Sequence, residues 1–125
     1  PSFHHDISTI NDNSCVLKIE YLGHSILLCA DIEEQGIETL LSRIPEPRSD
    51  IMQIPHHGSS INNLGAFIRK VRPMYAFINS CDNITSPKTL DILKTQHIHV
   101  LLSHRKGAIT FEVNKNGISY ATFNE

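Results

Sequence analysis

The sequence lacks any long apolar run. No stretch of about 18 consecutive apolar residues occurs, so no segment of the chain is expected to span a membrane. It also lacks an excess of charge of either sign, because 11 Lys and Arg residues stand against 13 Asp and Glu residues, for a net charge of -2. Such a balance is not typical of a nucleic-acid-binding surface or of a disordered acidic tail. A nucleic-acid substrate would therefore need a local basic patch or a metal ion.

Cysteine is scarce, and its spacing does not favour a disulfide framework. The three cysteines, Cys15, Cys29 and Cys81, are widely separated and form no CxxC motif. This usage favours a reducing compartment, such as the cytoplasm, for the isolated chain. Cys15 and Cys29 fall within apolar strand patterns, so we expect both to be small buried hydrophobic residues.

Several functional motifs are also missing. The sequence has no GxGxxG, no GxxxxGK[ST] and no GxSxG, which leaves nucleotide-binding loops and serine-hydrolase elbows without support. A Cys/His nucleophile pair is neither favoured nor excluded. No signal peptide is visible, and the start at Pro1 rather than at Met suggests a processed, truncated or excised piece.

Hydrophobic periodicity predicts a single α/β domain or half-domain over residues 1–125. Its order is β-β-α-β-α-β-α-β-β-β, which indicates a mixed sheet with about three helices packed on it. Strands are expected at 14–21, 25–30, 50–54, 75–78, 99–102, 109–113 and 118–123, and helices at 33–43, 63–71 and 87–96. Asn116-Gly117 predicts a hairpin between the last two strands.

Polar residues follow two successive strands of this pattern. Asp31 ends a buried apolar run, and a Pro-His-His-Gly-Ser segment with His56, His57, Gly58 and Ser59 follows the next strand. A right-handed crossover places both strand ends on one edge of the sheet, where Asp and His are plausible ligands for Zn²⁺ or Mn²⁺. Ser59 could donate a hydrogen bond to an oxyanion. The alternatives are that Asp31 caps the following helix and that the two histidines lie in a solvated loop.

Two further histidine groups are candidates. His104 follows a strand end beside Arg105 and Lys106, where it could contact a phosphate of a substrate; a solvated turn is the alternative. His4 and His5 could supply missing metal ligands, although their spacing matches no metal motif.

At these residues the chain resembles a known family. The segments are Asn-Asp-Asn-Ser at 11–14, Leu-Leu-Cys-Ala-Asp at 27–31, Asp-Ile-Met-Gln-Ile-Pro-His-His-Gly-Ser at 50–59, and Arg72-Pro73. They resemble the metallo-β-lactamase superfamily, and in particular the hydrolase-like domain of ComEC-type bacterial competence (DNA-uptake) proteins. The resemblance extends from about residue 11 to residue 113.

The resemblance implies the C-terminal half of an αββα sandwich. It implies that Asp31 bridges two zinc or manganese ions and that His56 binds one of them, with His57 as the ligand if the register is off by one. The implied reaction is metal-assisted hydrolysis of a phosphodiester, with DNA or another phosphodiester as the substrate and with Asp31, His56 and His57 in the catalytic site. A competence protein would also be attached to the cell surface or membrane.

The chain departs from the family pattern in ways that leave its activity open. An HxHxDH motif and a third metal histidine are absent, Cys29-Ala30 replaces Thr-Gly, and Thr85-Ser86-Pro87 stands near the expected Gly-His-Pro. Two alternatives follow. The missing ligands belong to an N-terminal half or a partner chain, or the chain is a non-catalytic binding or structural module that has lost its metals. In both cases a half-domain would expose the face that packs on the other half.

Overall fold

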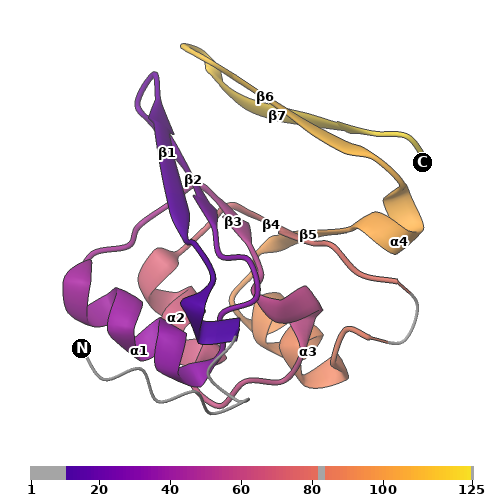
Figure 1. Cartoon of the computed structure of the whole chain (residues 1–125). Coiled ribbons are helices and arrows are strands. Elements are labelled where there is room, and N and C mark those ends of the chain that lie inside the picture. Colours follow the sequence, from indigo (N-terminus) through magenta and orange to yellow (C-terminus); the bar gives the residue numbers. More distant parts are fainter. Residues whose placement is uncertain (1–10, 82–83, 125) are drawn as a thin grey trace.

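The computed structural model describes residues 11–81 and 84–124, in which a sheet carries helices on one face and a hairpin above the other (Figure 1). The strands are β1 (Leu17–Tyr21), β2 (His24–Leu28), β3 (Ile51–Gln53), β4 (Tyr75–Ile78), β5 (His99–Leu102), β6 (Ile109–Asn114) and β7 (Gly117–Thr122). The helices are α1 (Glu34–Arg43), α2 (Leu64–Val71), α3 (Pro87–Thr95) and α4 (Ser103–Lys106), with single 3₁₀ turns η2 (Asn11–Asn13) and η3 (His56–Gly58). None of these helices has the length and apolar character needed to cross a bilayer.

The main sheet confirms the mixed α/β class predicted from the sequence. In the described residues its five strands follow the order β1-β2-β3-β4-β5, with β1 antiparallel to β2 and the other neighbours parallel. Helices α1, α2 and α3 connect the successive parallel strands, so the carboxyl ends of β2 to β5 lie along one edge. One difference from the prediction is α4, a single helical turn where a solvated turn was expected.

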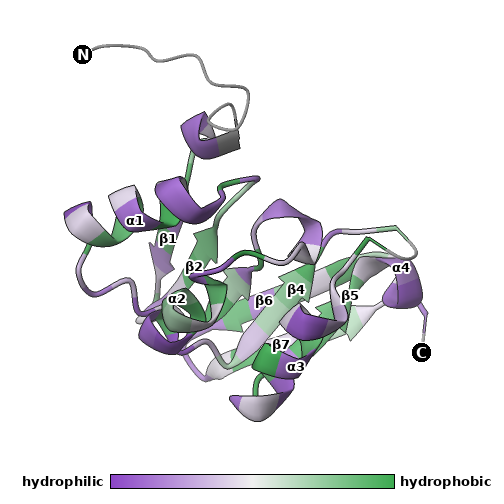
Figure 2. Cartoon of the chain, turned by 90° about the horizontal axis from the view of Figure 1, so that it is seen from below, coloured by the Kyte–Doolittle hydropathy of each residue, from purple (hydrophilic) through white to green (hydrophobic). Residues whose placement is uncertain are grey.

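The main hydrophobic core lies between the sheet and its helices. Viewed from the helix side, α1, α2 and α3 lie across the strands (Figure 2). Leu27 and Met52 from the sheet are buried against Phe67 and Val71 of α2 and Leu93 of α3, each with an exposed fraction of 1% or less. Burial of large apolar side chains like these is the main stabilising contribution to the fold.

The opposite face of the sheet is covered in part by the β6–β7 hairpin. The ring of Tyr75 on β4 lies 5.8 Å from Phe111 of β6 and 5.6 Å from Tyr120 of β7, centroid to centroid. Phe77 lies 6.0 Å from Phe111. The tilted and edge-on geometry is the one that aromatic rings prefer, so this cluster fixes the hairpin over β4 and β5.

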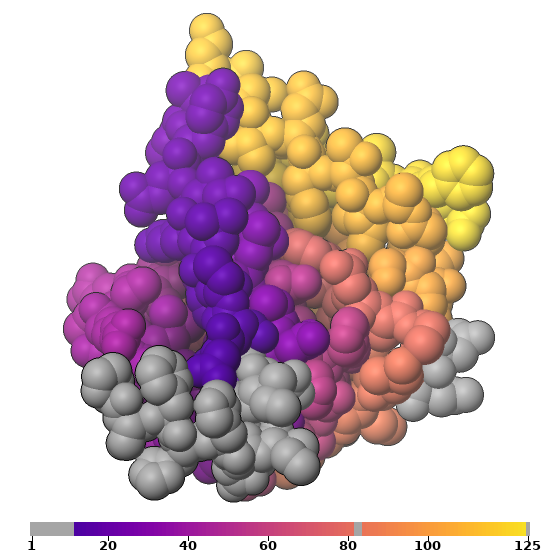
Figure 3. Space-filling model, in the orientation of Figure 1, coloured from indigo at the N-terminus to yellow at the C-terminus, as the bar shows by residue number. Residues whose placement is uncertain are grey.

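Strand β1 exposes apolar side chains to solvent. Leu17 and Ile19 are 50% and 40% exposed, because they lie on the edge strand and on the face away from the helices. The indigo strand is open to solvent in the space-filling view (Figure 3). The prediction that Cys15 is buried was wrong for a related reason, since this residue precedes the edge strand and is exposed. Cys29, after the neighbouring β2, is buried as predicted.

Candidate functional site

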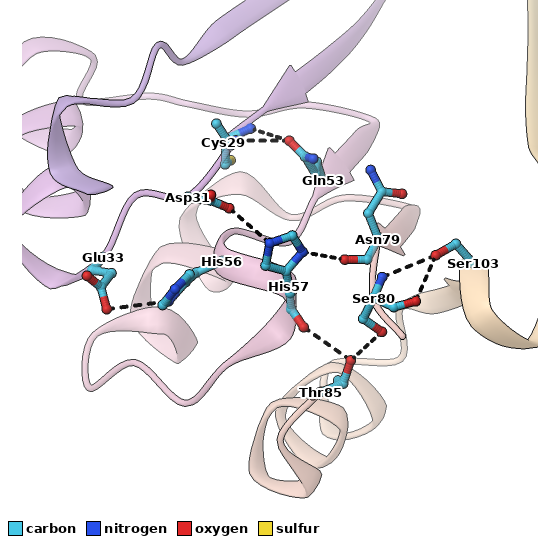
Figure 4. Close-up of polar contacts among 11 residues, drawn as sticks. Cys29, Asp31, Glu33, Gln53, His56, His57, Asn79, Ser80, Thr85 and Ser103 are labelled. Atoms are coloured by element: carbon cyan, nitrogen blue, oxygen red, sulfur yellow. Dashed lines mark hydrogen bonds and ion pairs between the residues drawn. The ribbon is translucent and has the colours of Figure 1, made fainter. Parts of the chain in front are cut away.

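Polar side chains gather at the carboxyl edge of the parallel strands. Asp31 follows β2, His57 follows β3, Ser80 follows β4 and His104 follows β5. Most of their contacts appear together in Figure 4. Ligands in open α/β sheets bind outside this edge, so it is the first place to look for a functional site.

The backbone before Asp31 is held by a side chain of the neighbouring strand. Gln53 Oε1 accepts hydrogen bonds from the backbone N–H groups of Cys29 at 3.0 Å and Ala30 at 2.9 Å. Ala30 has a left-handed φ of 52°, and its carbonyl accepts from His56 N–H at 3.0 Å. These three bonds tie the ends of β2 and β3 together and leave the Asp31 carboxylate 46% exposed.

The alternative role of Asp31 as a helix cap is not what the structure shows. Asp12 Oδ1 accepts hydrogen bonds from Glu33 N–H at 2.7 Å and from Gly36 N–H at 2.8 Å. This carboxylate therefore satisfies the free donors in the first turn of α1 and complements the helix dipole. Capping from Asp12 leaves Asp31 available for another role.

The segment after β3 makes an unusual turn. His56, His57 and Gly58 have φ values of 52°, 55° and 76°, so three consecutive residues adopt left-handed conformations. The left-handed conformation is strained for non-glycine residues, so contacts with the surrounding structure must stabilise it here. Gly58 N–H donates to Pro55 O at 3.1 Å, and Ser59 N–H donates to His56 O at 3.0 Å. The turn directs the two adjacent imidazoles to different partners.

His57 is the histidine that faces Asp31. Its Nε2 atom lies 3.5 Å from Asp31 Oδ1, and its Nδ1 atom lies 2.6 Å from the backbone carbonyl oxygen of Asn79. A carbonyl can only accept, so Nδ1 carries the proton and donates it. In the neutral ring Nε2 then presents its lone pair toward a carboxylate oxygen. Two such electron-rich atoms attract a proton or a metal cation between them.

His56 lies against a different carboxylate. Its Nδ1 atom is 3.4 Å from Glu33 Oε1, and its side chain is 28% exposed against 49% for His57. Of the two histidines that the sequence left as alternatives, the structure brings His57 and not His56 to Asp31. The sequence could not decide between them, because three consecutive left-handed residues are not predictable from the motif.

A network of hydroxyl groups lies next to His57. Thr85 Oγ1 donates to the His57 carbonyl at 3.2 Å and lies 2.9 Å from Ser80 Oγ, which lies 3.2 Å from His104 Nδ1. Ser80 N–H donates to Ser103 Oγ at 3.1 Å. The network connects the ends of β4 and β5 to the turn that carries His57.

The structure does not join the Ser59 hydroxyl to the Asp31–His57 pair. No hydrogen bond in the described part of the chain joins the Ser59 hydroxyl to Asp31 or His57, and the Ser59 carbonyl accepts from Thr89 Oγ1 at 3.4 Å. His4 and His5 lie outside the described residues. Within residues 11–81 and 84–124, no group of three or more His, Cys, Asp or Glu side chains could hold a metal ion.

Three supporting residues were missed by the sequence analysis. Gln53, Asn79 and Ser80 each belong to this site through the hydrogen bonds described above. One signal could have found them: all three are polar residues at or just beyond the carboxyl end of a predicted parallel strand.

Comparison with known proteins identifies relatives that cover most of the chain. It is 29% identical over 110 residues to ComE operon protein 3 of Bacillus subtilis, a match that covers 85% of this chain. It is 27% identical over 113 residues, or 86% of this chain, to competence protein ComA of Neisseria gonorrhoeae. It is 35% identical over 81 residues, or 61% of this chain, to recombination protein 2 of Haemophilus influenzae. No family model matches.

These matches support a link between the chain and competence proteins. The identity is modest, and the aligned region spans 14% of the length of the first of these relatives and 16% of the second. The chain therefore corresponds to a small segment of those larger proteins.

Proposed function

We propose that this chain supplies Asp31 and His57 as two metal ligands of a hydrolase domain of the metallo-β-lactamase type. The proposed reaction is hydrolysis of phosphodiester bonds in nucleic acid, with zinc or manganese in a dinuclear site. One observation carries the proposal: His57 Nε2 lies 3.5 Å from Asp31 Oδ1 while the other ring nitrogen donates to the Asn79 carbonyl.

The donor set fits a metal ion in part. A histidine that binds a metal through one nitrogen usually donates its other N–H to a carbonyl or carboxylate, as His57 does to Asn79. Carboxylate oxygen and imidazole nitrogen are both common ligands of Zn²⁺. A catalytic zinc needs about three protein ligands, so further ligands must come from outside the described residues. When bound, such ions lower the pKa of a water molecule and clamp the phosphate.

The residues of this chain orient the two ligands. Gln53 fixes the backbone that leads into Asp31, and the carbonyl of Asn79 selects the His57 tautomer with Nε2 toward Asp31. Thr85 holds the His57 backbone from the other side. A ligand pair held from several sides loses little entropy on binding and keeps its geometry during the reaction.

The names of the relatives support nucleic acid as the substrate. Two of them are named a competence protein and a recombination protein, and recombination is a process of nucleic acid. A phosphodiester is also the bond that a two-metal site can activate from both sides.

A second candidate function is a non-catalytic module that keeps the fold without the metals. It is favoured by the absence of a third candidate ligand beside the Asp31–His57 pair in the described residues. The two functions differ in the intact protein. If the protein is a hydrolase, it should cleave single-stranded DNA in the presence of Mn²⁺, and His57→Ala should abolish this activity. If it is a non-catalytic module, the DNA should stay intact.

The metal proposal is tested on the chain itself by nuclear magnetic resonance. Long-range ¹H–¹⁵N spectra of the imidazoles are followed during titration with ZnCl₂. We expect weak binding that shifts Nε2 of His57 while its Nδ1 stays protonated. His57→Ala and Asp31→Asn should abolish this response, and the matched control His56→Ala should retain it. A response that depends on His56, or one of equal size at every histidine, would contradict the proposal.

A further inference from the structure

A cavity of about 330 Å³ lies at the carboxyl ends of β4 and β5, and it is lined by Asn79, whose backbone carbonyl accepts the hydrogen bond from His57. Its lining includes Phe77, Asn79 and Ser103 from the sheet side and Phe111 from β6. This volume is at the small end of the range for ligand pockets, which suits one planar ring system rather than a long segment of polymer.

The cavity joins an aromatic wall to a polar one. Phe77 and Phe111 are half-buried, with ring centroids 6.0 Å apart and planes tilted by 48°. Aromatic walls of this kind stack with nucleobases without regard to sequence. On the polar side, the Asn79 amide offers donors and an acceptor that match the edge of a base.

Asn79 connects the cavity to the proposed metal ligands. Its backbone carbonyl accepts the hydrogen bond from His57 Nδ1, and its side chain is exposed and lines the cavity. The amide points away from the His57 ring (Figure 4). A group bound in the cavity would therefore contact a residue that also contacts the proposed metal ligand His57.

The charges around the cavity favour a phosphate-bearing ligand. Arg105 and Lys106 lie in α4, directly between the lining residues Ser103 and Gly107. In the described part of the chain no charged side chain, acidic or basic, lines the cavity itself. A basic segment next to the cavity in the sequence would attract phosphates locally, although the net charge of the chain is -2.

We infer that the cavity is a nucleobase subsite for single-stranded nucleic acid. A base enters against Phe77 and Phe111, Asn79 contacts its edge, and the adjoining phosphate lies toward Asp31 and His57. The strand is single because a paired base would have to leave its stack to enter. The inference rests on the proposed function for the identity of the polymer, but the cavity itself needs no metal to bind a base.

The test compares two fluorescein-labelled oligonucleotides of equal charge, octathymidylate and an abasic octamer, by fluorescence anisotropy in EDTA. We expect octathymidylate to bind more tightly. Phe111→Leu keeps an apolar side chain and removes the ring, and it should lower octathymidylate affinity about tenfold, the size expected for one lost stacking contact. It should leave abasic binding unchanged. Tyr120→Leu is the matched control, because Tyr120 belongs to the same aromatic cluster without lining the cavity.

Asn79→Ala provides a second variant should Phe111→Leu fail to fold, since it removes an exposed side chain and retains the carbonyl that holds His57. It should weaken octathymidylate binding severalfold, whereas Asn116→Ala in the β6–β7 turn should not. Equal binding of the two octamers, or no binding of either, would overturn the inference. So would an equal effect of Phe111→Leu and Tyr120→Leu. The anisotropy test is carried out in EDTA and needs no metal ion, so failure of the zinc titration and failure of this test are separate results.

Discussion

Gly58 lies so close to Thr85 that a Cβ atom at position 58 would stand 2.8 Å from Thr85 Cγ2. The same atom would be 3.3 Å from two carbons of Ile78, and φ of Gly58 is +76°. The glycine of the His-His-Gly-Ser turn is thus required both by its backbone conformation and by the space left under Thr85. The contact also places the Thr85 hydroxyl where it can hold the His57 carbonyl.

We expect Gly58→Ala to lower the free energy of unfolding by about 2 to 4 kcal/mol, from left-handed strain and steric overlap combined. The double variant Gly58→Ala with Thr85→Ser removes Cγ2 and keeps the hydroxyl, so it should recover part of this loss. Urea unfolding of the parent, both single variants and the double variant gives the coupling. Strict additivity of the two substitutions would show that the Thr85 contact is unimportant.

A second prediction concerns Gln53, whose Oε1 accepts two backbone hydrogen bonds. Gln53→Leu leaves the N–H groups of Cys29 and Ala30 without this acceptor and should destabilise the fold by about 2 kcal/mol or more. Gln53→Glu keeps an acceptor oxygen and should fall closer to the parent. Gln35→Leu, at an exposed position of α1, serves as the control for added apolar surface. If Gln53→Leu unfolds at the same urea concentration as this control, the role assigned to Gln53 is wrong.

Much of the fold follows from patterns that are local in the sequence. Period-2 and period-3.6 apolar spacing predicts each strand and helix of the main sheet, and the predicted bounds at Tyr75–Ile78 and His99–Leu102 agree with the structure. The alternation of strands and helices then places Asp31 and His57 on one edge, because each crossover returns the chain in the same direction.

What the sequence could not give depends on contacts between distant residues. The apolar face of β1 looks like a buried one by periodicity, but Leu17 and Ile19 are exposed because nothing in the described residues covers that edge of the sheet. The cap of α1 comes from Asp12, 21 residues before Glu33, so no local capping signal identifies it. The choice between the two histidines depends on left-handed φ values that the surrounding fold imposes.

The third prediction uses two helical glycines with opposite surroundings. A Cβ atom at Gly36 in α1 would lie 2.7 Å from Asp12 Oδ1 and 2.9 Å from Ile32 Cβ, whereas at Gly65 in α2 the nearest atoms are 3.7 Å away. Gly36→Ala should therefore destabilise the protein by about 1 to 3 kcal/mol, although alanine has a higher helix propensity than glycine. Gly65→Ala should be neutral or stabilise it by up to about 1 kcal/mol. Thermal unfolding checks both, and equal shifts of the same sign would refute the assigned contacts.

The fourth prediction concerns the accessibility of the thiols. Cys15 and Cys81 are exposed, and Cys29 is buried with an exposed fraction of 0%. Burial raises the pKa of the Cys29 thiol from its ordinary value of 9.0 to about 12. A thiol reagent such as 5,5′-dithiobis(2-nitrobenzoate) needs the thiolate, so the native protein should react quickly at two cysteines and at the third only when it unfolds. Fast reaction of three thiols in the native protein would contradict the burial of Cys29.

The raised pKa of Cys29 also predicts how stability depends on pH. Below pH 9 the thiol is protonated in both the folded and the unfolded chain, so its ionisation does not change the free energy of unfolding. Between pH 9 and pH 12 the unfolded chain loses this proton while the folded chain keeps it, and the free energy of unfolding falls as the pH rises. Cys29→Ala lacks this proton and serves as the reference for all other titrating groups. Urea unfolding from pH 8 to pH 11 measures the stability of the parent relative to Cys29→Ala. This difference in the free energy of unfolding should be constant up to about pH 9 and then decrease. A constant difference over the whole range would show that the thiol ionises equally in both states.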